Sequence, residues 1–483
     1  MQALEPLNKE LGQNIRELHQ RLPIGRSFDL VTRELLLGET KAYWIGVNGL
    51  CKTDLLQRIF SDLQDPFFVQ NGTIENLELY MQSKIGYAQT ELAKDWDTVI
   101  RALLSGPTIL FVDGFEAAII LDVRNYPTRG VAEPDVEKVT RGARDGFVET
   151  LLFNCNLIRR RIRCPALTFE MVNVGSASRT DVAIAYVNGL AEEKLLSLIR
   201  KKLKNLQVDC LTMGTKSLEE LLIPKKWYHP LPAMQLTERP DVAGSYLMEG
   251  HVLLIVDNTP SVLVLPCSIF RFTQSVEDYY KNPVVGNYFR LVRLACIPIS
   301  LFLLPLFLLI SLYEPTLAGQ IGLIRAGESS PFQTILFVLL VELGLDLFRY
   351  SSAHTPDRFA GTLSIVGELI AGDVAISMNW ASTEAIFYAA ITMLATLSLA
   401  SVEFGEGIRI YRLFLIVLTA IAGQLGLIAG TVLVMVSVAT TPTFAGESYL
   451  WPLFPCNKKA LYNIIFRRPT STAQPERQWR RMG

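Results

Sequence analysis

Residues 294–313 read LACIPISLFLLPLFLLISLY, twenty residues without a charged side chain between Arg293 and Glu314. An α-helix rises about 1.5 Å per residue, so this stretch covers about 30 Å, the thickness of a bilayer's hydrocarbon core. Pro298 and Pro305 each remove a helical hydrogen bond, which neighbouring helices in a membrane bundle can compensate. The stretch therefore predicts a membrane-spanning helix.

Three further apolar stretches follow, at residues 332–348, 385–402 and 413–446. Between them, residues 359–377 are moderately apolar but are interrupted by glycines and carboxylates. Irregular backbone is tolerated at membrane depth only where protein or water surrounds it. We therefore expect a bundle of about four transmembrane helices with one broken or re-entrant segment, and five or six spans stay open as alternatives.

Basic side chains flank the predicted membrane region on both sides. Three precede the first span, and seven lie in the tail after residue 446. Basic segments tend to remain on the cytoplasmic side, so the N-terminal region and the tail are both predicted to be cytoplasmic. This orientation places Arg409 and Arg412 on the opposite side of the membrane, with Glu403 and Glu406 available as partners.

The overall composition averages a soluble region and a membrane region. The chain has 483 residues, of which 50% are hydrophobic and 19% charged, less than the quarter or so that is usual for soluble domains. The formal net charge of −1 argues against a dedicated nucleic-acid binder. Seven scattered cysteines, without a C-x-x-C pair, argue against a disulfide framework or a structural metal site. The charged N-terminal stretch does not resemble a signal peptide.

The region before residue 285 contains a duplication. Val47-Asn48-Gly49-Leu50 recurs as Val187-Asn188-Gly189-Leu190, and Gly106-Pro-Thr-Ile-Leu-Phe-Val-Asp113 is echoed by Gly250-His-Val-Leu-Leu-Ile-Val-Asp257. Each copy is typical of a β-strand, an Asn-Gly turn, an amphipathic helix and a β-hairpin. Two matches at similar offsets predict two tandem duplicated α/β subdomains ahead of the membrane helices.

The resulting domain organisation has five parts. They are an N-terminal helix with the first α/β subdomain (1–128), a bridge with an arginine cluster (129–164), a second α/β subdomain (165–285), a transmembrane domain (286–446) and a basic cytoplasmic tail (447–483).

No catalytic motif is present in the sequence. Phosphate-binding, dinucleotide-binding, serine-hydrolase and zinc-protease signatures are all missing, and the four histidines are isolated. Val-Asp-Gly at 112–114 ends a strand as a phosphatase nucleophile does, but its counterpart at 256–258 favours hairpin turns at both places. We predict a protein that is not an enzyme and needs no cofactor or metal.

Carboxylates within the predicted membrane region are the best candidates for function, because burying a charge in a membrane is costly. Glu342 and Asp346 are four residues apart and share one helix face, while Glu368 and Asp373 lie in the glycine-broken segment. They either pair with cations of the same subunit, such as Arg349 or Arg358, or line a water-filled cation path.

The bridge ends in a cluster of four arginines, Arg159, Arg160, Arg161 and Arg163. Three interpretations are open. The cluster is a solvated helix C-terminus favoured by the macrodipole, a subunit contact with an acidic surface such as Glu133, Asp135 and Glu137 of a neighbour, or a site that docks on anionic lipid headgroups.

Five segments outside the apolar stretches together form a recognisable signature. They are Arg129-Gly-Val-Ala-Glu-Pro-Asp135, Arg141-Gly-Ala-Arg-Asp-Gly-Phe147, Asn156-Leu-Ile-Arg-Arg-Arg-Ile-Arg163, Glu238-Arg-Pro-Asp241 and Ser275-Val-Glu-Asp-Tyr-Tyr280. This signature resembles that of the GerA-type spore germination proteins. The resemblance covers nearly the whole chain. Ala143 stands where many nutrient-receptor A subunits have proline, and Asp145 where they have glutamate, as in the branch associated with stage V of sporulation.

The resemblance implies a multi-pass protein of the spore inner membrane, with its α/β region and tail on the core side. It also implies a homo-oligomer, possibly a pentamer, that releases monovalent cations and amplifies germination beside a small membrane partner protein. A nutrient germinant receptor A subunit and a membrane-anchored signalling scaffold without conduction are the alternatives.

Overall fold

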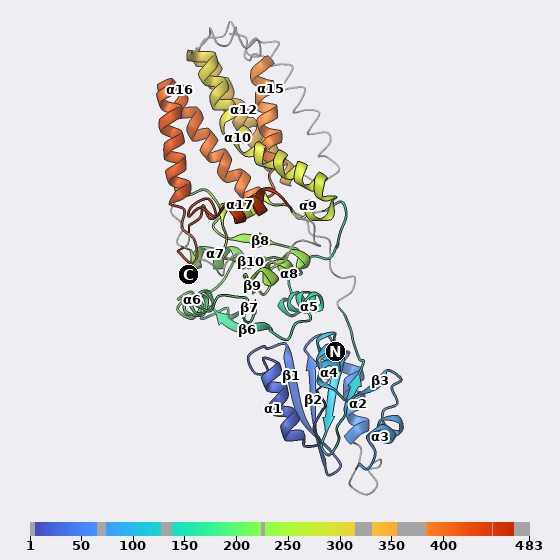
Figure 1. Ribbon diagram of the computed structural model, residues 1–483. Helices are drawn as coiled ribbons and strands as arrows, with labels where there is room; N and C mark the ends of the chain where they lie inside the picture. Colours follow the sequence, from blue (N-terminus) through green and yellow to red (C-terminus); the bar gives the residue numbers. More distant parts are fainter. Residues whose placement is uncertain are drawn as a thin grey trace. The chain divides into compact units, whose positions relative to one another are not determined.

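The computed structural model describes residues 5–64, 74–126, 137, 139–223, 228–313, 331–354, 383–446 and 448–467. These residues belong to two compact units (Figure 1). Of the described residues, those up to 223 and 234–266 belong to the first unit, and those at 228–233 and from 267 to 467 belong to the second.

The first unit begins with a five-stranded antiparallel sheet of order β1-β2-β4-β5-β3. Its strands are β1 (Leu30–Leu37), β2 (Thr40–Val47), β3 (Thr90–Ala93), β4 (Thr108–Val112) and β5 (Ala118–Leu121). Helices α1 (Leu11–Arg21) and α4 (Trp96–Leu104) pack on one face, and α2 (Thr53–Gln64) and α3 (Leu77–Lys84) on the other.

Both faces of this sheet are buried, which explains the continuous apolar run in β2. Tyr43 and Ile45 pack in the core beneath α1 and α4, whereas Ala42 and Trp44 pack beneath α2 and α3. Successive side chains of a strand point to opposite faces, so a central strand covered on both sides is apolar throughout.

A second antiparallel sheet has the same topology, with the order β6-β7-β9-β10-β8. Its strands are β6 (Leu167–Val174), β7 (Thr180–Val187), β8 (Gln235–Thr237), β9 (Val252–Val256) and β10 (Val262–Leu265). Its helices are α5 (Leu151–Arg161), α6 (Glu193–Lys204), α7 (Thr215–Leu222) and α8 (Pro240–Glu249). The predicted tandem α/β arrangement is confirmed at the level of two antiparallel sheets.

The repeat starts earlier than the sequence indicated. Helix α5, which the sequence analysis assigned to the bridge, corresponds to α1, because both are held by the same contacts. The Asp113 carboxylate accepts a hydrogen bond from the Leu11 amide (2.9 Å), and the Asp257 carboxylate accepts one from the Leu151 amide (3.0 Å). The two Val-Asp turns therefore cap the first helix of each repeat, which satisfies amide groups that have no partner within the helix.

The second unit is helical. After a short 3₁₀ turn, η2 (Ile269–Thr273), it contains α9 (Glu277–Tyr280), α10 (Pro283–Tyr313), α12 (Pro331–His354), α15 (Thr383–Leu397), α16 (Val402–Ala439) and α17 (Lys458–Ile465). Two of the described helices, α10 and α16, are long and apolar enough to cross a membrane. The count of four spans stays a prediction, and the predicted broken segment at 359–377 lies outside the described residues.

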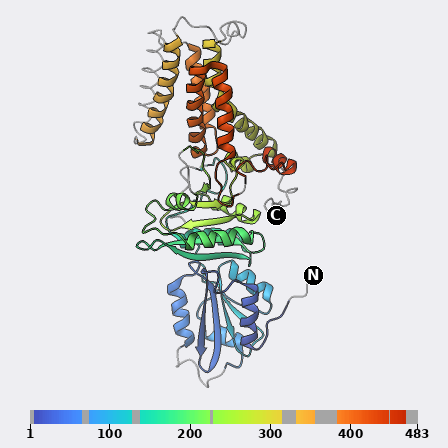
Figure 2. The same cartoon turned by 90° about the vertical axis from the view of Figure 1, so that its left-hand side faces the viewer.

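Helix α16 corrects the prediction of one span over residues 413–446. It begins at Val402, and Gly423 has φ 56° and ψ −130°, a non-helical conformation that L side chains rarely adopt. The Tyr411 and Ser437 hydroxyls lie 2.8 Å apart although 26 residues separate them. The helix therefore folds back at Gly423 into a first arm (402–422) and a second arm (424–439), which lie side by side in Figure 2.

Replacing Asp113 or Asp257 with alanine should destabilise the first unit by about 0.5–2 kcal/mol, the usual cost of losing a helix-capping side chain. The measurement is the midpoint of thermal unfolding of the full chain in detergent. Asp62→Ala is the matched control, because Asp62 is exposed on α2. Equal stability of all three variants would contradict the capping role.

Candidate functional site

The two carboxylates of α12 face arginines on the first arm of α16. Glu342 Oε2 accepts a hydrogen bond from Arg412 Nη2 at 2.8 Å, and both side chains are almost completely buried. One turn further along α12, Asp346 forms an ion pair with Arg409, and this pair is more exposed. The two carboxylates are four residues apart on α12, and the two arginines are three residues apart on α16. The pairs run in opposite directions along the two helices, so the helices are antiparallel here.

Arg412 joins four helices. Its Nη1 donates to the Ser300 carbonyl of α10 (2.8 Å) and to the hydroxyls of Ser300 and of Thr396 on α15 (both 3.1 Å). The two hydroxyls are 2.6 Å apart. We call Ser300, Glu342, Thr396 and Arg412 the Arg412 cluster. It supplies opposite charge and hydrogen bonds to a guanidinium that lies among apolar helices, where an unpaired charge is costly.

These contacts bear on three earlier predictions. The described partners of Glu342 and Asp346 are Arg412 and Arg409. Arg409 and Arg412 were expected on the opposite side of the membrane with Glu403 and Glu406 available as partners; their described ion-pair partners are Asp346 and Glu342, and the side of the membrane stays a prediction. Glu368 and Asp373, the other two residues of the predicted ion path, lie outside the described residues.

The arginine cluster of the bridge divides into buried and exposed members. Arg159 is 1% exposed, and its Nε donates to Asp29 Oδ2 at 2.8 Å. Its Nη2 donates to the Leu167 carbonyl at 2.9 Å. The prediction of a subunit or membrane contact is therefore wrong for Arg159, because the side chain is enclosed by its own chain and links α5 to the turn that precedes β1.

The other three arginines have different surroundings. Arg161 pairs with Asp145 at 2.5 Å and is partly buried. Arg160 is exposed and stacks over the Tyr126 ring at 4.7 Å. Arg163 is exposed and lines a polar cleft of about 570 Å³ together with Arg101 and Arg124. Arg160 and Arg163 remain candidates for a contact with a subunit or with lipid.

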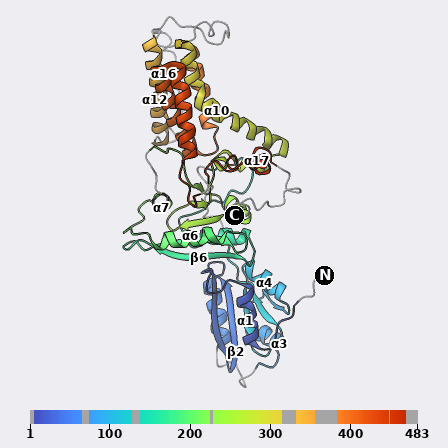
Figure 3. The ribbon, with the colours of Figure 1, turned by 60° about the vertical axis from the view of Figure 1, so that its left-hand side comes forward.

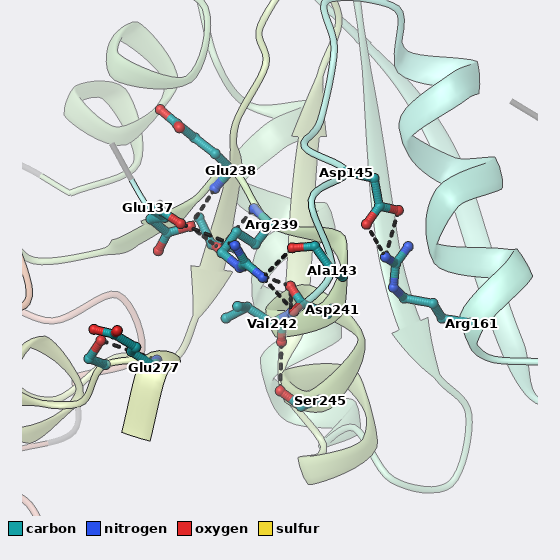
Figure 4. A network of polar contacts seen from close by, with 12 residues as sticks. Glu137, Ala143, Asp145, Arg161, Glu238, Arg239, Asp241, Val242, Ser245 and Glu277 are labelled. Atoms are coloured by element: carbon teal, nitrogen blue, oxygen red, sulfur yellow. Dashed lines mark hydrogen bonds and ion pairs between the residues drawn. The ribbon is translucent and has the colours of Figure 1, made fainter. Parts of the chain in front are cut away.

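Segments that carry the family resemblance meet around Arg239, as Figure 4 shows. Arg239 is fully buried and donates to the carbonyls of Ala143 (2.9 Å) and Glu137 (3.1 Å) and to the Asp241 carboxylate (2.8 Å). Residues 143 and 239–241 therefore form one structural network.

Glu137, which the sequence analysis offered as part of an acidic contact surface, is used within its own chain. Its Oε2 accepts hydrogen bonds from Thr237 Oγ1 (2.7 Å) and from the Glu238 amide (2.9 Å). Burial raises the pKa of the Glu137 carboxyl despite these two hydrogen bonds, which favour the charged form. Glu133 and Asp135 lie outside the described residues.

Comparison with known proteins gives one consistent result. The family model described as Bacillus/Clostridium GerA spore germination protein matches residues 16–478. The chain is 34% identical to stage V sporulation protein AF of Bacillus subtilis, over 96% of this chain and 93% of that protein. It is 32% identical to spore germination protein A1 of the same organism, over 78% of each chain.

Among solved structures, the chain is similar to the N-terminal domain of the A subunit of the Bacillus megaterium spore germinant receptor GerK3. The identity is 25% and the TM-score 0.43, over 55% of this chain and 97% of that chain.

Replacing Arg159 with methionine should destabilise the first unit by about 3–5 kcal/mol, because Asp29 would remain buried without its partner. For a region of this size, the thermal midpoint should fall by roughly 10 °C. Arg160→Met is the matched control. Arg160 is exposed, and its replacement removes only the contact with the Tyr126 ring, which is worth about 0.5–1 kcal/mol. Similar losses in both variants would contradict the assignment.

Arg412→Gln and Glu342→Gln should each lower the thermal stability of the full chain in detergent, by about 3–5 kcal/mol for a buried partner left unpaired. The double variant should lose less than the sum of the two, because neither charge is then stranded. Losses that simply add would indicate that the two residues do not interact.

Proposed function

The chain belongs to the Bacillus/Clostridium GerA spore germination protein family, and from this membership we propose that it forms a homo-oligomeric channel in the spore inner membrane. The channel releases monovalent cations and amplifies germination. Its relative stage V sporulation protein AF is similar over nearly its whole length, which favours a role in sporulation and germination over enzymatic chemistry.

The Arg412 cluster is the observation that carries this proposal. Carboxylates in apolar helices are expensive to keep, and where they occur they commonly mark ion pathways. In the described arrangement Glu342 and Asp346 are both neutralised by arginines, so neither attracts a cation. We therefore interpret the arrangement as closed, and separation of α12 from the first arm of α16 would free a face with two negative charges.

The orientation of the proposed channel is supported by contacts at the ends of the helical unit. Asn287 near the start of α10 and Arg467 after α17 exchange two hydrogen bonds, from the Arg467 amide (2.7 Å) and to the Arg467 carbonyl (3.3 Å). The start of α10 and the segment after α17 therefore lie next to each other. This agrees with an α/β region and a basic tail on the same, cytoplasmic side of the membrane.

The proposal includes self-association, possibly into a pentamer, and a small membrane partner protein. A path shared between subunits would place acidic faces around a common axis, as in cation channels with rings of carboxylates.

Potassium efflux from vesicles that contain the purified full chain tests conduction. Arg412→Gln frees the Glu342 carboxylate and should raise efflux several-fold over the original sequence. Glu342→Gln/Arg412→Gln removes both charges, so it should lose that increase while it still assembles.

The control is Arg58→Gln, which changes an exposed arginine of α2, far from the α12 carboxylates in sequence. Unchanged efflux in every variant, with the proteins still assembled, would reject conduction and favour a signalling scaffold. Light scattering on the same preparations tests the oligomer, since a monomer offers no shared central path.

A further inference from the structure

Helix α10 is longer than a bilayer requires. Its 31 residues extend for about 46 Å, whereas a hydrocarbon core is about 30 Å thick. The uncharged stretch starts only at Leu294, so the first three turns, residues 283–293, are left over. Figure 3 shows these turns leaving the helical bundle at an angle.

The outer face of these turns is apolar and exposed. Val284 is 78% exposed and Tyr288 63% exposed, and Val285, Phe289, Leu291 and Val292 are also exposed. Six large apolar side chains within nine residues form a patch of the kind that marks a contact surface.

The inner face of the same turns is charged and anchored. Arg290 is 1% exposed and donates to the Ile464 carbonyl of α17 at 3.0 Å. Arg293 donates two hydrogen bonds, of 2.9 Å and 3.1 Å, to the buried carboxylate of Asp278. The helix is therefore held by one face, and this fixes its exposed apolar face in one direction.

Positive charge borders the patch. Lys281 Nζ lies 4.1 Å from the centre of the Phe289 ring and 3.2 Å from the Glu277 carboxylate. Helix α17, which α10 contacts through Arg290, begins with the exposed Lys458. Tyr462 and Phe466, whose ring centroids lie 5.1 Å apart, add exposed aromatic rings on α17. Aromatic rings with neighbouring lysines are typical of segments at the boundary between a membrane and water.

We propose that residues 281–293 lie flat on the membrane surface, with the apolar face of α10 in the headgroup region and Lys281 and Lys458 against anionic phospholipid headgroups. A lipid surface fits better than a protein partner, because the patch continues directly into a predicted span and is bordered by cations. The proposal rests on α10 crossing the membrane, and it does not depend on conduction.

Spin labels on single cysteines test this arrangement in the full chain, with its seven native cysteines replaced by serine. Labels are placed at Tyr288→Cys and Phe289→Cys, and the protein is reconstituted in vesicles of phosphatidylcholine and phosphatidylglycerol in equal parts. Membrane contact should give collision rates with oxygen several-fold above those with a water-soluble nickel complex. Accessibility to nickel would overturn the proposal, as would shielding from both reagents, which would indicate a second copy on this face.

Two control labels separate this inference from the proposed membrane span. Leu306→Cys lies within the predicted span and should contact oxygen, whereas Lys194→Cys on α6 should contact nickel. A label at 306 that contacts nickel would reject the span itself, and a label at 288 alone that does so would reject only the surface placement.

The role of the lysines has its own comparison. In vesicles of phosphatidylcholine alone, the ratio of oxygen to nickel collisions at residue 288 should fall. In the mixed vesicles, Lys281→Glu/Lys458→Glu should reproduce that fall. Ratios that are the same in both lipids would overturn recognition of anionic headgroups.

Discussion

A charge that leaves water needs an opposite charge or hydrogen bonds within reach, and this constraint sets much of the architecture of this protein. Arg159 and Asp29 are 130 residues apart in the chain, and Arg412 and Glu342 are 70 apart. Replacing such a pair with apolar side chains often costs little, whereas separating its members costs several kcal/mol, on the order of 3–5. These pairs therefore select one arrangement of segments more than they add stability.

The tandem α/β sheets could be predicted because short motifs recur at two places in the sequence. The apolar run of α10 could be predicted because it is continuous along one segment. The first helix of the repeat could not, because α1 and α5 share few residues, although Asn14 and Asn154 occupy equivalent positions and make the same contacts with Asn8 and Val148. The reversal at Gly423 was also missed, since hydropathy is uniform on both sides of it.

The partners of the α12 carboxylates were missed for a similar reason. Spacing along one helix shows which residues share a face, but it does not show which helix lies opposite. The signal was nevertheless present, because Arg409 and Arg412 form a basic face that is complementary to Glu342 and Asp346 on an antiparallel neighbour. Ser300 of α10 accepts a hydrogen bond from Arg412 and lies seven residues after Arg293. Helix α10 therefore connects the Arg412 cluster to the first three turns of the same helix, residues 283–293.

The caps on α1 and α5 have a consequence for biosynthesis. Each cap comes from a residue more than a hundred positions later in the chain, Asp113 for Leu11 and Asp257 for Leu151. A ribosome therefore releases each of these helices well before the carboxylate that closes its first turn. Contacts between distant positions form late because the intervening loop must close first. Each repeat should thus fold as a unit only after its hairpin has emerged, and the first could do so while the apolar helices are still being made.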